Sequence, residues 1–140
     1  MKLAYLDSCV YIAHFEGLPI YKTILARHLA QLAQGGWLSC ISEIVILEVL
    51  AKPLQNQQDT LAQHYQKLFQ TLRILENYPQ LFTDALHIMQ TEHLKIIDAL
   101  HVAIAVHHDC QLFVSSDPHF RLLKTIRPHW IDLSGVVSSA

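Results

Sequence analysis

Four acidic residues stand at positions where a carboxylate needs a chemical reason. Asp7 and Asp117 each come just after an apolar run, LAYL and LFV respectively. Glu48 and Asp98 lie within the apolar segments ISEIVILEVLA and IIDALHVAIAV. A carboxylate that faces an apolar core costs several kcal/mol unless it is paired or bound to a metal. These acids are therefore the first candidates for an active site.

The four carboxylates would repel one another if they met, and near neutral pH only a hard cation makes such a cluster tolerable. Ligation by oxygen alone favours Mg²⁺ or Mn²⁺ over zinc. Such an ion can generate hydroxide from water and hold a phosphodiester for in-line attack. The acids therefore predict a metal-dependent hydrolase, with Asp7, Glu48, Asp98 and Asp117 as catalytic metal ligands.

Each acid also has a simpler explanation, which the sequence leaves open. Asp7 and Asp117 suit the caps of the helices that follow them, and a proline after Asp117 fits the first helical position. Glu48 also fits the surface of a helix that is apolar nearly all round, and Asp98 fits a charge that complements a helix dipole. His101, one turn after Asp98, fits a hydrogen-bonded core histidine better than a metal ligand.

The elements that position the acids follow from the hydrophobic pattern. Apolar runs predict strands at residues 3–6, 37–41, 72–76, 112–114 and 130–133. Helical spacing predicts helices from Ile20 to Gly35, from Ser42 to a break at Pro53, over 59–70, 80–91 and 96–108, and a short one opening at Asp117. Strands that alternate with helices predict a parallel sheet covered on both faces. Ligands bind such sheets outside the carboxyl ends of the strands, so we expect Asp7 and Asp117 at that edge.

Length and composition limit the class of protein. The 140 residues fit a single domain, residues 1–140, and 51% apolar against 16% charged residues is typical of a compact globule. The formal net charge is −2 with the ten histidines counted as neutral. No global basic field therefore attracts nucleic acid, and a polyanion has to be bound locally or through a metal.

Cysteine usage and the absence of long apolar stretches predict a soluble, cytoplasmic protein. Cys9, Cys40 and Cys110 are odd in number and far apart, which argues against a disulfide framework. The N-terminal residues lack the apolar run of a signal peptide, and no stretch reaches the roughly 18 apolar residues that span a bilayer. We expect no contact with a membrane.

The segments LDSCVYIA, ISEIVILEVL, IIDALHVAIA and LFVSSDPHF, in this order and spacing, resemble the four acidic motifs of PIN domains. The similarity is greatest to the VapC-type toxins of bacterial toxin–antitoxin pairs, and it covers residue 3 to about residue 133. It implies a three-layer α/β/α sandwich around a parallel sheet of about five strands. It also implies Mg²⁺- or Mn²⁺-dependent endonucleolytic cleavage of RNA at Asp7, Glu48, Asp98 and Asp117. A toxin of this kind would be a homodimer held by a cognate antitoxin protein.

Residues near the acids are expected to contact the RNA. Ser8 and Ser115 stand where relatives carry a hydroxyl, and Ser116 follows. The segment after Asp117 is basic and rich in histidine: His119, Arg121, Lys124, Arg127 and His129. It suits a phosphate-binding rim as well as a solvated amphipathic segment. Lys52, one turn after Glu48, suits either an ion pair with that acid or a phosphate contact.

The sequence departs from the family pattern in three places. Cys9 follows Ser8 where threonine-serine or threonine-asparagine is usual, Asp109 replaces a glycine that commonly ends the helix, and an arginine of the 83–92 helix is missing. Two other functions stay open: a PIN-fold module that binds RNA or protein with little catalysis, and a small phosphohydrolase with Asp7 as nucleophile. The second usually requires another acid beside Asp7, where Ser8 and Cys9 stand.

Overall fold

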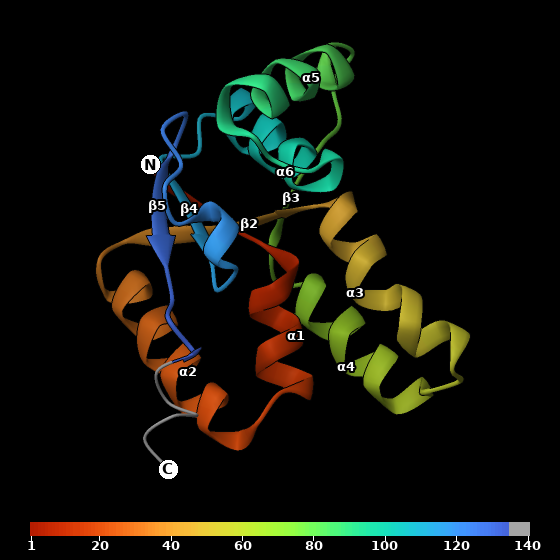
Figure 1. Ribbon diagram of the computed structural model, residues 1–140. Coiled ribbons are helices and arrows are strands. Elements are labelled where there is room, and N and C mark those ends of the chain that lie inside the picture. Colours follow the sequence, from red (N-terminus) through yellow and green to blue (C-terminus); the bar gives the residue numbers. More distant parts are fainter. Residues whose placement is uncertain (135–140) are drawn as a thin grey trace.

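A five-stranded, all-parallel sheet forms the centre of the computed structural model, which describes residues 1–134; residues 135–140 of the predicted domain lie outside the described residues. The strands are β1 (Lys2–Leu6), β2 (Trp37–Ser42), β3 (Arg73–Leu75), β4 (Leu112–Ser115) and β5 (Arg127–Trp130), in the order β3-β2-β1-β4-β5. The helices are α1 (Ser8–Glu16), α2 (Pro19–Gln34), α3 (Glu43–Gln55), α4 (Asp59–Phe69), α5 (Leu81–Glu92) and α6 (Ile96–His107), with a 3₁₀ turn η1 (Pro118–Phe120). Figure 1 shows α5 and α6 above the sheet and α1 and α2 below it. The predicted three-layer α/β/α sandwich is confirmed.

Strand β1 lies at the centre of the sheet and carries the most buried run. Four of its five residues are buried, which is typical of a parallel strand covered on both faces. It pairs with β2 on one side and β4 on the other, and the N–H of Asp7 donates to the carbonyl of Val114 at 3.0 Å. This pairing brings the residues that follow β1 and β4 together at the carboxyl edge.

Two predicted boundaries are wrong for physical reasons. The last strand was expected at residues 130–133 but runs over Arg127–Trp130, because β5 is an edge strand and its pairing with β4 begins before the apolar run that predicted it. Ile131, fully buried, packs on the core just after it. Helix α3 continues past the predicted break at Pro53 to Gln55. A proline in the last turn removes only one intrahelical hydrogen bond, so the helix ends two residues later.

Asp109 ends the turn after α6 in the left-handed conformation, with φ +61°. This is the position at which the sequence departs from the usual glycine. Asp tolerates this conformation better than most residues, because its short side chain can bond locally. The departure therefore keeps the turn that leads into β4. Among the described helices, none is long and apolar enough to span a membrane.

Glu92, the last residue of α5, fixes the segment that leads into β5. Its Oε2 accepts from the N–H of Lys124 at 2.8 Å, the N–H of Thr125 at 2.6 Å and the hydroxyl of Thr125 at 2.6 Å. Partial burial raises the pKa of Glu92, but these hydrogen bonds and the charge of Lys124 outweigh it and leave the pKa below its ordinary value.

Glu92→Gln should lower the free energy of unfolding by about 1 kcal/mol at pH 7, because charge-assisted hydrogen bonds become neutral ones. A carboxyl whose pKa is lower in the folded state stabilises above its ordinary pKa and loses that contribution as the pH falls. The difference between variant and wild type should therefore shrink from pH 7 to pH 4 in urea denaturation. Glu76→Gln, an exposed control, should change stability little; an equal effect of both would contradict the role of Glu92.

Candidate active site

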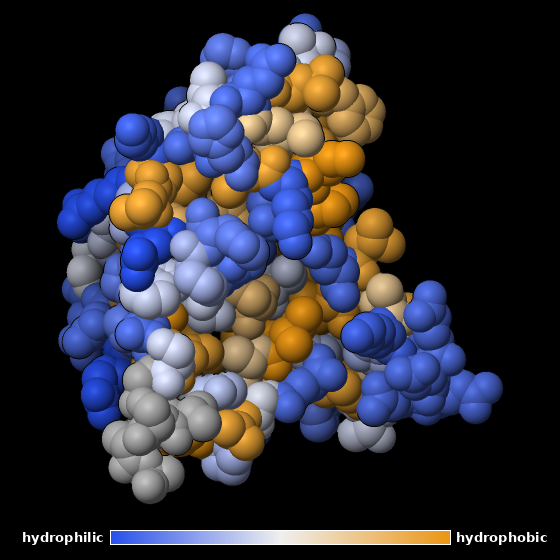
Figure 2. Space-filling view, in the orientation of Figure 1, coloured by the Kyte–Doolittle hydropathy of each residue, from blue (hydrophilic) through white to orange (hydrophobic). Residues whose placement is uncertain are grey.

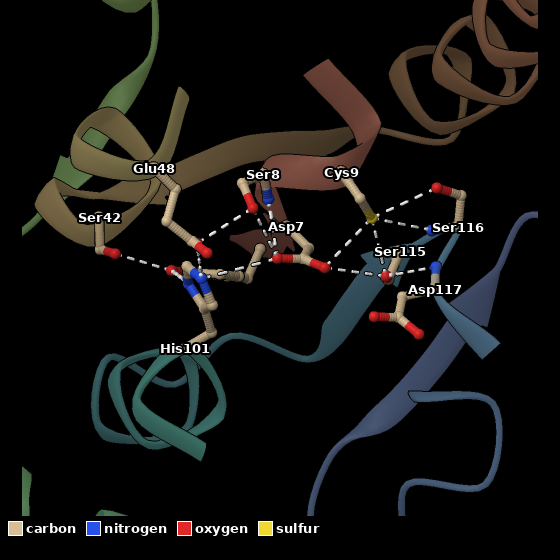
Figure 3. Close-up of polar contacts among 10 residues, drawn as sticks. Asp7, Ser8, Cys9, Ser42, Glu48, His101, Ser115, Ser116 and Asp117 are labelled. Atoms are coloured by element: carbon tan, nitrogen blue, oxygen red, sulfur yellow. Dashed lines mark hydrogen bonds and ion pairs between the residues drawn. The ribbon is translucent and has the colours of Figure 1, made fainter. Parts of the chain in front are cut away.

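The four acids meet at the carboxyl edge of the sheet, and they come from four segments. Asp7 directly follows β1, and Asp117 lies two residues after β4. Glu48 comes from the middle of α3, and Asp98 from the first turn of α6. Figure 3 shows Glu48, Asp7 and Asp117 in a row, with Asp7 in the middle.

Asp7 is the most buried of the acids, with 4% of its surface exposed. Its Oδ1 accepts from the N–H of Ser8 at 2.8 Å. Its Oδ2 accepts from the hydroxyl of Ser115 at 3.0 Å and from the thiol of Cys9 at 3.2 Å. All of these donors are neutral. Asp7 also occupies the N-cap position of α1, so the capping interpretation and the active-site interpretation are compatible.

Glu48 is held by two donors on a single oxygen. Its Oε1 accepts from Nε2 of His101 at 2.5 Å and from the hydroxyl of Ser8 at 3.0 Å. Partial burial raises the pKa of Glu48, but the hydrogen bond and charge of His101 and the bond from Ser8 lower it further, to below its ordinary value. Glu48 is therefore ionised at neutral pH. Its side chain is 35% exposed, so it lies at the surface as the simpler explanation expected, but its carboxylate is held by two buried donors.

His101 is 1% exposed, and both of its ring nitrogens have partners. Besides Glu48, it contacts the hydroxyl of Tyr5 through Nδ1 at 2.6 Å, and that hydroxyl contacts Ser42 at 2.7 Å. Ser42 sits at the predicted N-cap of α3, but its side chain makes no capping hydrogen bond. Burial raises the pKa of Tyr5 well above its usual range, so this side chain stays a hydroxyl. The predicted core histidine is therefore part of a buried polar chain that reaches Glu48.

A second acidic group lies on the other side of Asp7. Asp117 accepts from the backbone N–H of His119 at 2.9 Å and lies 3.0 Å from Nδ1 of that residue. Burial and then the charges of Asp7 and Asp117 raise the pKa of Asp98 above its ordinary value. Among the described residues, none donates a hydrogen bond to the Asp98 carboxylate, which makes it the least stabilised acid of the site.

The structure thus gathers the predicted acids into two neighbouring groups. Asp7, Glu48 and His101 form one and Asp98, Asp117 and His119 the other, with the possible ligand atoms of each within 4.8 Å of one another. Within residues 1–134, no lysine or arginine forms an ion pair with any of the four acids. Carboxylates that no lysine or arginine neutralises fit a divalent metal ion that prefers oxygen ligands. The acidic groups could therefore bind such an ion.

The residues predicted to contact substrate lie close to these groups but differ in exposure. Ser8 and Ser115 are buried and donate to the carboxylates of Glu48 and Asp7, so their first role is to hold the acids. The Ser116 hydroxyl bonds the thiol of Cys9 at 3.3 Å. Lys52 is exposed and, in the described part of the chain, makes no ion pair with Glu48. The other predicted contacts, His119 and Arg121, are exposed, and Arg121 lies over the ring of Trp130.

Sequence reasoning missed two residues beside Asp98. His93 and Lys95 line a cavity of about 140 Å³ together with Leu94, Asp98 and His119. His93 adopts the left-handed conformation, with φ +57°, at the end of α5. Lys95 precedes Asp98 by one helical turn, a spacing that could have drawn attention to it. Nothing in the sequence pattern singles out His93.

A sequence model of the PIN domain matches residues 4–125, which include all four acids. The chain belongs to the PIN domain family. No curated protein sequence matches this PIN domain significantly.

Solved structures with the same fold include several VapC-type proteins. VapBC2 from Rickettsia felis, bound to a promoter DNA fragment, has a TM-score of 0.74 and 16% identity over 94% of this chain and 100% of that one. A toxin–antitoxin complex from Klebsiella pneumoniae has a TM-score of 0.66 and 20% identity over 88% and 94%. VapC20 from Mycobacterium tuberculosis, described as a sarcin-ricin loop cleaving toxin, has a TM-score of 0.69 and 14% identity over 89% and 99%. The predicted resemblance to PIN domains is confirmed.

Proposed function

We propose that this PIN domain is an endoribonuclease that hydrolyses RNA phosphodiester bonds with Mg²⁺ or Mn²⁺. The observation that carries the proposal is Asp98: a half-buried carboxylate without a hydrogen-bond donor among residues 1–134, whose pKa is raised by its own burial and by the charges of Asp7 and Asp117. A chain gains nothing in stability from such a residue, whereas a cation between these acids removes their repulsion.

The four acids Asp7, Glu48, Asp98 and Asp117 would hold the ion. When bound, the ion supplies an activated water and neutralises charge on the phosphodiester. The protein fixes the ligands in advance: Ser8 and Ser115 hold Asp7, while His101 and Ser8 hold one oxygen of Glu48. The second oxygen of Glu48 accepts no hydrogen bond from the described residues and is free to ligate.

The direct test is cleavage of mixed RNA by the purified protein with Mg²⁺, with Mn²⁺ or with EDTA. We expect cleavage with either ion, none with EDTA, and 5′-phosphate ends on the products. RNA that binds but is not cut would favour a binding module instead. Hydrolysis of a small phosphate ester without RNA cleavage would favour a phosphohydrolase.

We further propose that the protein is the toxin of a type II toxin–antitoxin pair and acts in the cytoplasm. Support comes from the family and from the toxin–antitoxin complexes that share the fold. Expression of the chain alone should arrest growth, and co-expression of a short protein encoded beside it should restore growth. Growth that is unaffected by the wild type, with active soluble protein present, would contradict a toxin.

A homodimer is also proposed, and an exposed apolar patch on α5 and α6 supports it. Phe82, Leu86 and Ile96 of this patch are 73%, 63% and 63% exposed, and Figure 2 shows apolar surface over these helices at the upper right. Exposed apolar patches of this kind mark interfaces. Phe82→Asp should convert a dimer to a monomer in light scattering, whereas Leu122→Asp, an exposed control on another segment, should not.

Lys95→Ala should weaken RNA binding through the cavity beside Asp98. We expect the KM for single-stranded RNA to rise several-fold with kcat little changed, because a phosphate contact contributes mainly to binding. Its loss should also reduce the slope of log affinity against log salt by about 0.7, the value of one single-strand phosphate contact. Lys67→Ala on α4 is the matched control, and the same change in both variants would contradict the contact.

A further inference from the structure

The buried polar chain Ser42–Tyr5–His101 ends on a carboxylate of the site. We propose that this chain positions Glu48 for the metal ion, and that His101 acts in it as a hydrogen-bond donor and not as a metal ligand. The proposal rests on the proposed metal-dependent function, because it assigns a task to residues around that same site.

The chain is continuous and shielded from water. The Ser42 and Tyr5 hydroxyls lie 2.7 Å apart, the Tyr5 hydroxyl lies 2.6 Å from Nδ1 of His101, and Nε2 lies 2.5 Å from Oε1 of Glu48. Ser42 and Tyr5 are fully buried, and His101 is 1% exposed. None of the three can touch RNA, so their effect on the site has to pass through Glu48.

The hydrogen positions follow from the partners. Oε1 of Glu48 lies at hydrogen-bond distance from Nε2 of His101, so Nε2 has to carry a hydrogen; a lone pair there would face a carboxylate oxygen. With the ring hydrogen on Nε2, Nδ1 is the acceptor and the Tyr5 hydroxyl donates to it. The Tyr5 oxygen accepts in turn from Ser42. Tyr5 thereby selects the tautomer of His101 that can hold Glu48.

The distances around His101 distinguish a hydrogen-bond donor to Glu48 from a metal ligand. Two atoms that bind one ion at about 2.1 Å lie roughly 3 Å apart when they are adjacent in an octahedron. Nε2 and Oε1 are closer than this, at 2.5 Å, and Nδ1 is already used by Tyr5. Both donors to Glu48 also share Oε1, so the chain orients the carboxylate without occupying its other oxygen.

The cost of this arrangement supports a function. Ser42 occupies the N-cap position of α3, but its hydroxyl bonds to Tyr5 and makes no capping hydrogen bond. Helix α3 therefore lacks a capping interaction that typically contributes about 1 kcal/mol. A buried polar chain is rarely more stable than apolar side chains of the same volume. Outer partners of metal ligands, by contrast, typically contribute 10-fold to 100-fold to metal affinity or activity.

The test is Mn²⁺ binding to the intact protein, measured by titration calorimetry without RNA, beside the Mn²⁺ concentration that gives half-maximal cleavage. Tyr5→Phe removes one distant oxygen, releases the tautomer of His101, and should weaken Mn²⁺ binding about tenfold. Ser42→Ala should weaken it less. His101→Gln keeps an N–H near Glu48 and should bind more tightly than His101→Leu.

Tyr65→Phe is the matched control, because it also removes the hydroxyl of a buried tyrosine that donates to a carboxylate, that of Glu16. It should leave Mn²⁺ binding unchanged. Wild-type Mn²⁺ affinity in both Tyr5→Phe and Ser42→Ala would overturn the proposal. So would an equal loss of Mn²⁺ binding in His101→Gln and His101→Leu with unchanged binding in Tyr5→Phe, because that result is expected if His101 is itself a metal ligand. Wild-type protein that binds Mn²⁺ but cleaves no RNA would overturn the proposed function alone.

Discussion

Asp98→Asn should abolish RNA cleavage and at the same time raise the stability of the metal-free protein. The substitution removes a proposed metal ligand, so we expect activity to fall at least about 100-fold. It also removes a charge that the fold disfavours, because burial and the charges of Asp7 and Asp117 raise the pKa of Asp98. The side chain is partly exposed, so solvent screening limits the gain to about 0.5 kcal/mol, or about 2 °C in Tm.

The RNA cleavage assay measures the activity of the variant, and thermal unfolding with and without Mn²⁺ measures its stability and its metal binding. The wild type should gain stability when Mn²⁺ is added, since the ion binds only the folded state, and the variant should gain much less. Without metal, the difference in stability between Asp98→Asn and the wild type also depends on pH. A carboxyl with a raised pKa destabilises the fold most once it is ionised, so the advantage of the variant should disappear as the pH falls towards 4. A variant that unfolds at a lower temperature than the wild type in EDTA would contradict this account.

Asp7→Asn should abolish cleavage to a similar degree but destabilise the protein. Asp7 is nearly buried and accepts from Ser8, Ser115 and Cys9, whereas an asparagine amide presents an N–H₂ group to donors on one side. Buried donors that lose their acceptor cost about 1–3 kcal/mol.

The two substitutions are matched, because each changes one carboxylate to an amide in the same site. Urea denaturation without metal should therefore give changes of opposite sign for Asp98→Asn and Asp7→Asn. Equal changes in the free energy of unfolding would indicate that the hydrogen bonds to Asp7 do not stabilise the fold. Cleavage that survives both substitutions would remove the acids from the mechanism altogether.

Much of the site could be predicted because its physics is local in sequence. Asp7 and Asp117 follow strands, and parallel strands end at one edge. Glu48 and Asp98 stand out against apolar neighbours on their own helices. The hydrophobic pattern also predicted how strands and helices follow one another along the chain. It misplaced the bounds of the edge strand β5, which depend on tertiary contacts.

What the sequence could not predict depends on partners far along the chain. His101 meets a residue 96 positions away, and that spacing has no periodic signature. For the same reason, the sequence did not predict that the acids form two groups, with a histidine in each. His93 and Lys95 lie at a turn whose direction depends on how α5 packs against α6.

The pairing of β1 with β4 has a consequence for how the protein is made. Asp7 leaves the ribosome early, but its partner Ser115 and the last acid, Asp117, are more than 100 residues later. During synthesis the first half of the chain can join β1 to β2 only, and both the acceptor of the Asp7 N–H and the donor to its side chain are still missing. The complete set of acids therefore assembles only after the chain has been synthesised beyond Asp117 and β4 has paired with β1.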